Sequence, residues 1–191
     1  ALIAASAAWY DEVMSYPPVL TAPAPRKDVR QGCPFDCGPC QSHEQKVQLP
    51  IVPITSACNL DCPICYTHNR NDGAYHMTEP ELRAILGHLR RVAPDRRIIN
   101  LTGGEPTQHP AFERLIELCH EEGIQRITIS THGLRFLKDE WLLERLARLD
   151  ARVILSFDSF ASSVNKELLG GNFLEGKLRV LALLEKYRVN T

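Results

Sequence analysis

The chain has 191 residues, of which 44% are hydrophobic and 24% are charged, and its 22 basic and 23 acidic residues give a net charge of −1 at pH 7. These proportions are globular, and they argue against disorder, a collagen-like repeat or a coiled coil. The balanced charge lacks the basic surplus of proteins that bind nucleic acid or anionic membranes, so neither partner is expected.

Residues 1–48 predict an extended arm laid over the surface. Four of the thirteen prolines lie between residues 15 and 31, a segment without apolar periodicity. The apolar residues 1–8 follow no basic segment and precede Asp11 and Glu12, which predicts neither a signal peptide nor a transmembrane segment. Because the first residue is Ala, we expect upstream sequence to be missing.

From residue 49 onward the pattern predicts an α/β core over 49–191. Apolar runs indicate strands at 51–54, 98–101, 124–129 and 153–157. Helical periodicity indicates a helix from the Thr78–Glu81 capping box to Leu89, one from Phe112 to a stop at Gly123, and further helices at 139–149 and 174–187. Four βα units predict a parallel sheet, whose chemistry gathers at the carboxyl ends of the strands.

Six of the seven cysteines form two triplets with the same C-x3-C-x2-C spacing. The second triplet, Cys58, Cys62 and Cys65, follows the first predicted strand, and the first triplet is Cys33, Cys37 and Cys40. Three thiolates on one loop can each bind a different iron of a 4Fe–4S cube, which leaves the fourth iron open for substrate. Such clusters favour a reducing cytoplasm. The seventh cysteine, Cys119, lies in a helical pattern and is expected to be a buried small hydrophobe.

Zinc is the serious alternative. The pairs Cys37-x2-Cys40 and Cys62-x2-Cys65 are separated by the 21 residues 41–61, close to the spacing of a four-cysteine zinc site. That assignment leaves Cys33 and Cys58 unused, although each lies four residues before a Cys-x2-Cys pair. Two iron–sulfur clusters therefore explain the pattern better than zinc, a disulfide or a single catalytic thiol.

A second motif, Leu101-Thr102-Gly103-Gly104-Glu105-Pro106, ends the second predicted strand. Glycines let the backbone approach a ligand closely, and Glu105 adds a carboxylate beside them. Alone, this motif is compatible with an ordinary strand-to-helix turn. It gains weight from the cysteine loop after the neighbouring strand.

Together the two motifs resemble the radical S-adenosylmethionine (radical SAM) superfamily. The resemblance implies a partial (β/α) barrel in which Cys58, Cys62 and Cys65 hold a 4Fe–4S cluster, and the open iron chelates the amino and carboxylate groups of SAM. It also implies that Gly103, Gly104 and Glu105 hold the methionine amino group, and that Ile64 lies against adenine.

The same resemblance indicates weaker contacts at later strand ends. Ser130 ends the third strand in a segment where the family often has T-N-G and this chain has His132 instead of asparagine. Ser156 and Asp158 end the fourth strand, where family members commonly contact the ribose or sulfonium end of SAM. Polar capping of the turns is an equally weighted alternative for Ser130, Ser156 and Asp158.

The first triplet resembles a subfamily that includes tetraether lipid synthase and pterin methyltransferase-like proteins. There the additional cysteines bind an auxiliary cluster, which assigns that role to Cys33, Cys37 and Cys40. Those relatives have a fourth cysteine at the position of Gln48, and His43 is a candidate substitute in this chain.

The implied function is reductive cleavage of SAM to a 5′-deoxyadenosyl radical that abstracts hydrogen from an unidentified substrate, a lipid or another small molecule. C–C bond formation or methylation would follow. The electron donor would be a flavodoxin or ferredoxin, and the location cytoplasmic. The competing class is a non-catalytic module, either a four-cysteine zinc domain or an electron-transfer iron–sulfur protein.

Several expectations concern the frame around the site. Family cores generally have six βα units, so four suggest a truncated fragment whose activity in isolation is in doubt. Its fourth strand would have an uncovered edge, with Val189–Thr191 beginning a fifth strand. His109 and His120 are expected to face solvent, and the helix at 139–149 is expected to have a charged outer face formed by Glu144, Arg145 and Arg148.

Overall fold

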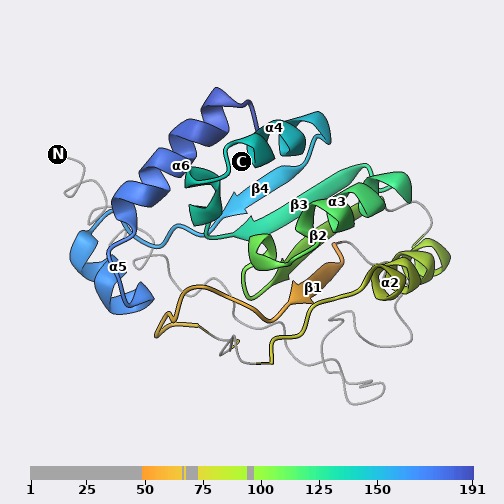
Figure 1. Cartoon of the computed structure of the whole chain (residues 1–191), viewed down its shortest axis with the longest axis horizontal. Helices are drawn as coiled ribbons and strands as arrows, with labels where there is room; N and C mark the ends of the chain where they lie inside the picture. The colour runs from red at the N-terminus through yellow and green to blue at the C-terminus, as the bar shows by residue number, and fades with distance from the viewer. Residues whose placement is uncertain (1–48, 66, 68–72, 94–96) are drawn as a thin grey trace, which may run out of the picture. The chain divides into compact units, whose positions relative to one another are not determined.

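The computed structural model describes residues 49–65, 67, 73–93 and 97–191, which are coloured in Figure 1. The predicted arm at 1–48 lies outside these residues, as do Cys33, Cys37 and Cys40. The boundary near residue 48 and the auxiliary triplet therefore stay predictions.

Four parallel strands form one sheet in the order β1-β2-β3-β4, as the βα pattern predicts. They are β1 (Ile51–Thr55), β2 (Ile98–Gly103), β3 (Arg126–Thr131) and β4 (Arg152–Leu155). The third strand begins two residues later than predicted because Ile124 belongs to the end of the preceding helix, where its amide donates to the carbonyl of Cys119 at 3.0 Å.

The helices α2 (Glu79–Val92), α3 (Phe112–Glu121), α4 (Trp141–Arg148) and α6 (Leu174–Lys186) match the predicted ones. The capping box at Thr78 and Glu81 is present, with both reciprocal hydrogen bonds. The short helices η1 (Pro106–Gln108) and η2 (Leu134–Leu137), and the helix α5 (Ser162–Leu169), were not predicted. Only Asn165 and Leu169 of α5 are buried, and its sequence has little of the apolar periodicity by which a helix is predicted.

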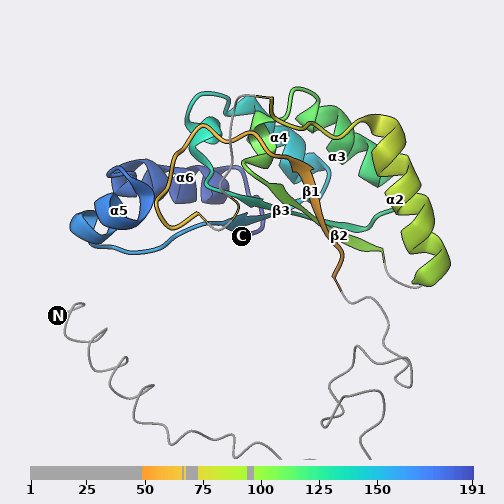
Figure 2. The ribbon, with the colours of Figure 1, turned by 90° about the horizontal axis from the view of Figure 1, so that it is seen from below.

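The core lies on one side of the sheet. Ile54, Ile99, Leu101 and Ile129 of the strands are fully buried there, together with side chains of the helices. Figure 2 shows α2, α3 and α4 on this face, and the part of the chain that the structure describes places no helix over the opposite face. We call the opposite side the open face. An α/β sheet covered on one side is the geometry of a partial barrel.

Two expectations need correction or refinement. His109 does not face solvent: it is 4% exposed, its Nε2 lies 2.9 Å from the Met77 carbonyl, and its Nδ1 accepts from the Ala111 amide. Packing between the β2 end and the start of α2 buries it, whereas His120 is exposed as predicted. The edge of β4 is partly covered, because Asn190 forms a parallel bridge with Arg152.

The prediction for Cys119 is confirmed, and the prediction of a charged outer face on α4 is confirmed for two of its three residues. Cys119 is fully buried in α3, and burial raises the pKa of its thiol to about 12. On α4, Glu144 and Arg148 are exposed, while Arg145 is half-buried and forms an ion pair with Glu117. No helix among the described residues is long and apolar enough to cross a bilayer.

Candidate functional site

The two predicted motifs meet at the carboxyl ends of β1 and β2. The Gly104 amide donates to the Thr55 carbonyl at 2.8 Å, and the Glu105 amide donates to the Ala57 carbonyl at 2.7 Å. Ala57 directly precedes Cys58, so these bonds fix the end of the glycine motif against the start of the cysteine loop.

Both glycines are required by this close approach. A Cβ atom on Gly103 would lie 2.1 Å from the Thr55 carbonyl oxygen, and a Cβ on Gly104 would lie 2.2 Å from the Ala57 carbonyl oxygen. Gly103 also has a φ of +132°, which side chains rarely allow. The glycines therefore let two neighbouring strand ends touch, which is a role beyond the ligand approach that the sequence predicted.

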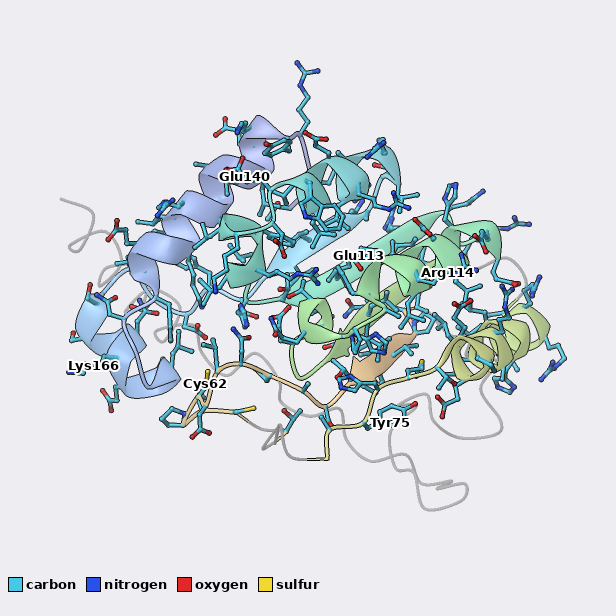
Figure 3. All side chains as sticks on the ribbon, viewed as in Figure 1. Cys62, Tyr75, Glu113, Arg114, Glu140 and Lys166 are labelled. Atoms are coloured by element: carbon cyan, nitrogen blue, oxygen red, sulfur yellow. The ribbon has the colours of Figure 1, made fainter. Side chains whose placement is uncertain are left out.

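The cysteine loop follows β1, and Cys62 is labelled on it in Figure 3. Cys58, Cys62 and Cys65 are all partly exposed. The Leu60 amide donates to the Cys58 sulfur at 3.5 Å, and the Cys65 amide donates to the Cys62 carbonyl at 2.9 Å, which closes a tight turn. Amide donors to sulfur stabilise a thiolate or a cluster-bound thiolate.

Helix α5 supports this loop from the other end of the chain. The Ile64 amide donates to the Leu168 carbonyl at 3.2 Å. Gly170, which ends α5 in the left-handed region, leaves so little room that an added Cβ would lie 3.2 Å from the Asp61 carbonyl oxygen. An element that the sequence did not predict therefore positions the cysteine loop.

The electrostatic environment of the thiols is mixed. Burial raises the pKa of the Cys58 thiol, to which the Glu105 carboxylate contributes. Burial and the neighbouring Cys65 raise the pKa of Cys62, and the cationic Lys177 opposes this shift. Among the described residues no three Cys, His, Asp or Glu side chains group around a single metal ion. A cubane makes a different demand, because each thiolate binds a separate iron.

Glu105 is held inside the protein by four hydrogen bonds and is 1% exposed. Its Oε1 accepts from the Thr107 amide and hydroxyl at 3.1 and 2.7 Å and from the Thr131 hydroxyl at 2.6 Å. Its Oε2 accepts from the His132 amide at 2.9 Å. Oε2 also lies 3.3 Å from the Nε2 of His132, and it accepts fewer hydrogen bonds than Oε1 does.

His132 connects Glu105 to the cysteine loop. The Leu134 amide donates to its Nδ1 at 3.1 Å, so Nε2 carries the proton of the neutral ring and donates to Asn59 Oδ1 at 2.9 Å. Burial lowers the pKa of this imidazole, which keeps it neutral. His132, which stands where the family often has asparagine, thus links Glu105 of the glycine motif to Asn59 of the cysteine loop.

Lys177, which is 2% exposed, was not among the residues predicted for the site. Its Nζ forms an ion pair with Asp158 at 3.1 Å, and its charge acts on both Cys62 and His132. A lysine in an amphipathic helix normally faces solvent. Only its partner Asp158 could have indicated that this lysine is buried. The cation therefore lies close enough to affect both the cysteine loop and the residue that follows β3.

The other predicted contact residues lie at or near the same strand ends. Ser130 lies one residue before the end of β3, and its hydroxyl donates to Asn100 Oδ1 at 3.2 Å. Ser156 follows β4 and is exposed, and Ile64 on the cysteine loop is 55% exposed. These positions are compatible with ligand contact, and their assignment to SAM remains a prediction.

Comparison with known proteins gives a family. The sequence model described as "Radical SAM superfamily" matches residues 52–191. A 7,8-dihydro-6-hydroxymethylpterin dimethyltransferase of Methanocaldococcus jannaschii is 31% identical over 160 residues, which cover 83% of this chain and 31% of that protein. The mycofactocin maturase MftC of Mycobacterium tuberculosis is 27% identical over 147 residues, which cover 74% of this chain and 36% of the maturase.

Solved structures have the same fold. Native anSMEcpe with bound AdoMet and Cp18Cys peptide matches with a TM-score of 0.60 and 25% identity, over 74% of this chain and 40% of that one. Streptococcus suis SuiB bound to S-adenosylmethionine matches with a TM-score of 0.58 and 22% identity, over 74% of this chain and 30% of SuiB. The chain thus spans about a third of the length of the curated relatives just described.

Proposed function

The chain belongs to the radical SAM superfamily, and on that premise we propose that its Cys58, Cys62 and Cys65 hold a 4Fe–4S cluster that binds SAM. Such a cluster, when bound and reduced, would supply the electron for cleavage of SAM into methionine and the radical that abstracts hydrogen. The protein contributes ligation, orientation of SAM and exclusion of water.

The observation that best supports this proposal is the pair of hydrogen bonds between the glycine motif and the base of the cysteine loop, at 2.8 and 2.7 Å. Neither a zinc module nor an electron carrier needs a Gly-Gly-Glu segment bonded to its cysteine loop. A SAM-binding cluster does, because the same ligand must reach both the open iron and the strand end.

The charges around the site fit the two ends of the methionine part of SAM. The ammonium group suits Glu105 Oε2 and the backbone of Gly103 and Gly104, because Oε2 accepts fewer hydrogen bonds than Oε1. The carboxylate suits Lys177, a buried cation with one partly exposed partner. Adenosine would then extend toward Ile64, toward Ser130 near the end of β3, and toward Ser156 and Asp158, which follow β4.

The finer parts of the proposal concern other groups and partners. Cys33, Cys37 and Cys40 would hold an auxiliary iron–sulfur cluster, and a flavodoxin or ferredoxin in the cytoplasm would supply the electron. The relative with 31% identity is named for methylation of a dihydropterin. Methylation of a small molecule is therefore the outcome we favour, and C–C bond formation on a lipid is the alternative.

One experiment tests the class of protein. Anaerobically reconstituted protein is expected to be brown, to contain iron and sulfide, and to release 5′-deoxyadenosine when given SAM and dithionite. A colourless zinc protein, or a brown protein that leaves SAM intact, would contradict the proposal and would favour a zinc or an electron-transfer module, respectively.

Variants of the two triplets separate their roles. Cys62→Ala is expected to abolish SAM cleavage, because it removes a ligand of the cluster at the strand ends. Cys37→Ala is expected to lower the iron content and still leave SAM cleavage. EPR spectra and 5′-deoxyadenosine yields of both variants provide the measurement. If Cys37→Ala stops cleavage and Cys62→Ala spares it, the two clusters are assigned the wrong way round.

A further inference from the structure

The open face of the sheet has a polar centre. On β2 and β3, Ile99, Leu101, Ile127 and Ile129 point into the core and are at most 1% exposed. Side chains alternate along a strand, so the residues between and after them lie on the open face. These residues are Asn100 and Thr102 of β2 and Thr128 and Ser130 of β3, and we call them the polar cluster.

The polar cluster is a contiguous patch. Asn100 lies opposite Thr128 in the sheet, and Ser130 donates to the Asn100 side chain at 3.2 Å. Adjacent strands are about 5 Å apart, and residues two apart on one strand are about 7 Å apart. The patch is therefore about 5 by 7 Å, roughly the area of a fused two-ring heterocycle.

Hydrogen-bonding capacity in the patch is unused. Asn100 is 6% exposed and Thr128 is 7% exposed. Within the described residues, one end of the Asn100 amide and the Thr128 hydroxyl have no hydrogen-bond partner. Neither is among the fully enclosed polar atoms without a partner, so both are reachable from outside. Such groups bind either water or a polar ligand.

Aliphatic side chains flank the patch on both outer strands. In the sheet register, Ile51 of β1 lies opposite Asn100, and Ile154 of β4 lies opposite Ser130. Ile51 is 64% exposed and Ile154 is 50% exposed, so both can contact a ligand that lies on the sheet. A packed barrel instead fills its interior with bulky branched side chains at the central positions as well.

We propose that the polar cluster binds the substrate through a neutral ring system that both donates and accepts hydrogen bonds, and not through an acyl chain. An amide and three hydroxyls offer donors and acceptors without net charge, and the flanking isoleucines contact the apolar surface of the ring. An acyl chain on this patch would leave the Asn100 and Thr128 groups unpaired. The patch continues to the end of β3, next to the Glu105–Thr131 hydrogen bond, so a ring bound there lies beside the SAM site. Ser130, which the proposed function also places near adenosine, would lie between the two ligands.

The proposal rests on the proposed function, because it takes the ring compound to be the substrate of the reaction at the strand ends. The test uses reconstituted protein that contains its cluster and SAM. Calorimetry measures binding of three probes, 6-hydroxymethylpterin, guanosine and dodecanoate, to the unmodified protein and to variants. SAM cleavage is measured in the same preparations.

At least one of the two ring probes is expected to bind, and Thr128→Val and Asn100→Leu are each expected to weaken it about tenfold or more. Valine has nearly the shape of threonine and also favours strands, so the Thr128→Val variant should have the same Tm as the unmodified protein. Ser163→Ala, which removes an exposed hydroxyl from α5, is the matched control and should leave binding unchanged.

Two results would overturn the inference. One is that neither ring probe binds, or that a ring probe binds with the same affinity to Thr128→Val and Asn100→Leu. The other is that dodecanoate binds more tightly than both rings. If either result occurs while 5′-deoxyadenosine still forms, the substrate class is wrong and the proposed function stands. If no 5′-deoxyadenosine forms, the proposed function itself has failed.

Discussion

Gly104→Ala tests whether the contact between the glycine motif and the cysteine loop organises the site. The added methyl carbon would lie 2.2 Å from the Ala57 carbonyl oxygen and 2.8 Å from the Ser56 carbonyl oxygen. A non-bonded carbon and oxygen need about 3.2 Å or more, so the two strand ends must separate by about 1 Å. This movement stretches the bonds of 2.8 and 2.7 Å beyond hydrogen-bonding distance.

The expected cost follows from the two lost bonds and the overpacking. Each broken hydrogen bond costs about 1 kcal/mol, and forcing a methyl into a packed site costs about 1–3 kcal/mol. These contributions add to about 3–5 kcal/mol, so we expect Gly104→Ala to lower the free energy of unfolding by at least about 3 kcal/mol, measured by urea denaturation of the cluster-free protein. For a chain of this length, that corresponds to a fall of about 6–12 °C in Tm.

A matched control lies in helix α2. An added Cβ on Gly87 would have no atom within 4 Å, so Gly87→Ala should stabilise the protein by about 1 kcal/mol through helix propensity. Gly104→Ala should also lose iron and SAM cleavage after reconstitution, whereas Gly87→Ala should keep both. The reasoning is refuted if Gly104→Ala unfolds within about 0.5 kcal/mol of the unmodified protein and still binds its cluster.

Two further predictions concern buried ionisable groups. Lys177→Met removes the buried cation near Cys62 and is expected to raise the KM for SAM about tenfold or more, with the iron content unchanged. The control Lys166→Met, at an exposed lysine, should change neither the KM nor the iron content. Equal KM values for the two variants would contradict the assignment of Lys177 to the SAM carboxylate. Burial lowers the pKa of His109, so the unfolded chain binds a proton at higher pH than the folded protein does. The contribution of His109 to the free energy of unfolding should be complete above about pH 6.5. It should fall toward lower pH by at most about 1.4 kcal/mol per pH unit. His109→Gln should flatten urea-unfolding profiles between pH 6.5 and 5, and His120→Gln should not; an unchanged profile for His109→Gln would refute the assignment.

The sheet and most of its helices could be predicted because their signals are local. The strands are buried against helices and read as short apolar runs, such as Ile98 to Leu101. The helix start at Thr78 depends on a side chain only three residues away, Glu81. The cysteine loop and the Gly103-Gly104 segment were recognised by spacing within a few residues, and the parallel sheet then brings them together.

The features that escaped prediction depend on partners far along the chain. Lys177 is buried because Asp158, nineteen residues earlier, pairs with it. His132 and Asn59 form a hydrogen bond although they are 73 residues apart in the sequence, and no local pattern around either residue predicts this contact. Burial of His109 depends on the Met77 carbonyl, 32 residues earlier. Spacing along the chain cannot encode such pairings.

The bond between Ile64 and Leu168 has a consequence for the order of folding. The strands are added one after another along the sheet, so each βα unit can pack on the previous one as soon as it is made. The cysteine loop is different, because the backbone that holds it lies more than a hundred residues later. On the ribosome, the loop of Cys58 to Cys65 therefore lacks its contacts with α5 and Gly170 until these residues have emerged. If these cysteines hold the proposed cluster, its assembly is expected to follow the synthesis of α5, and a ribosome stalled before residue 170 would present the thiols without this support.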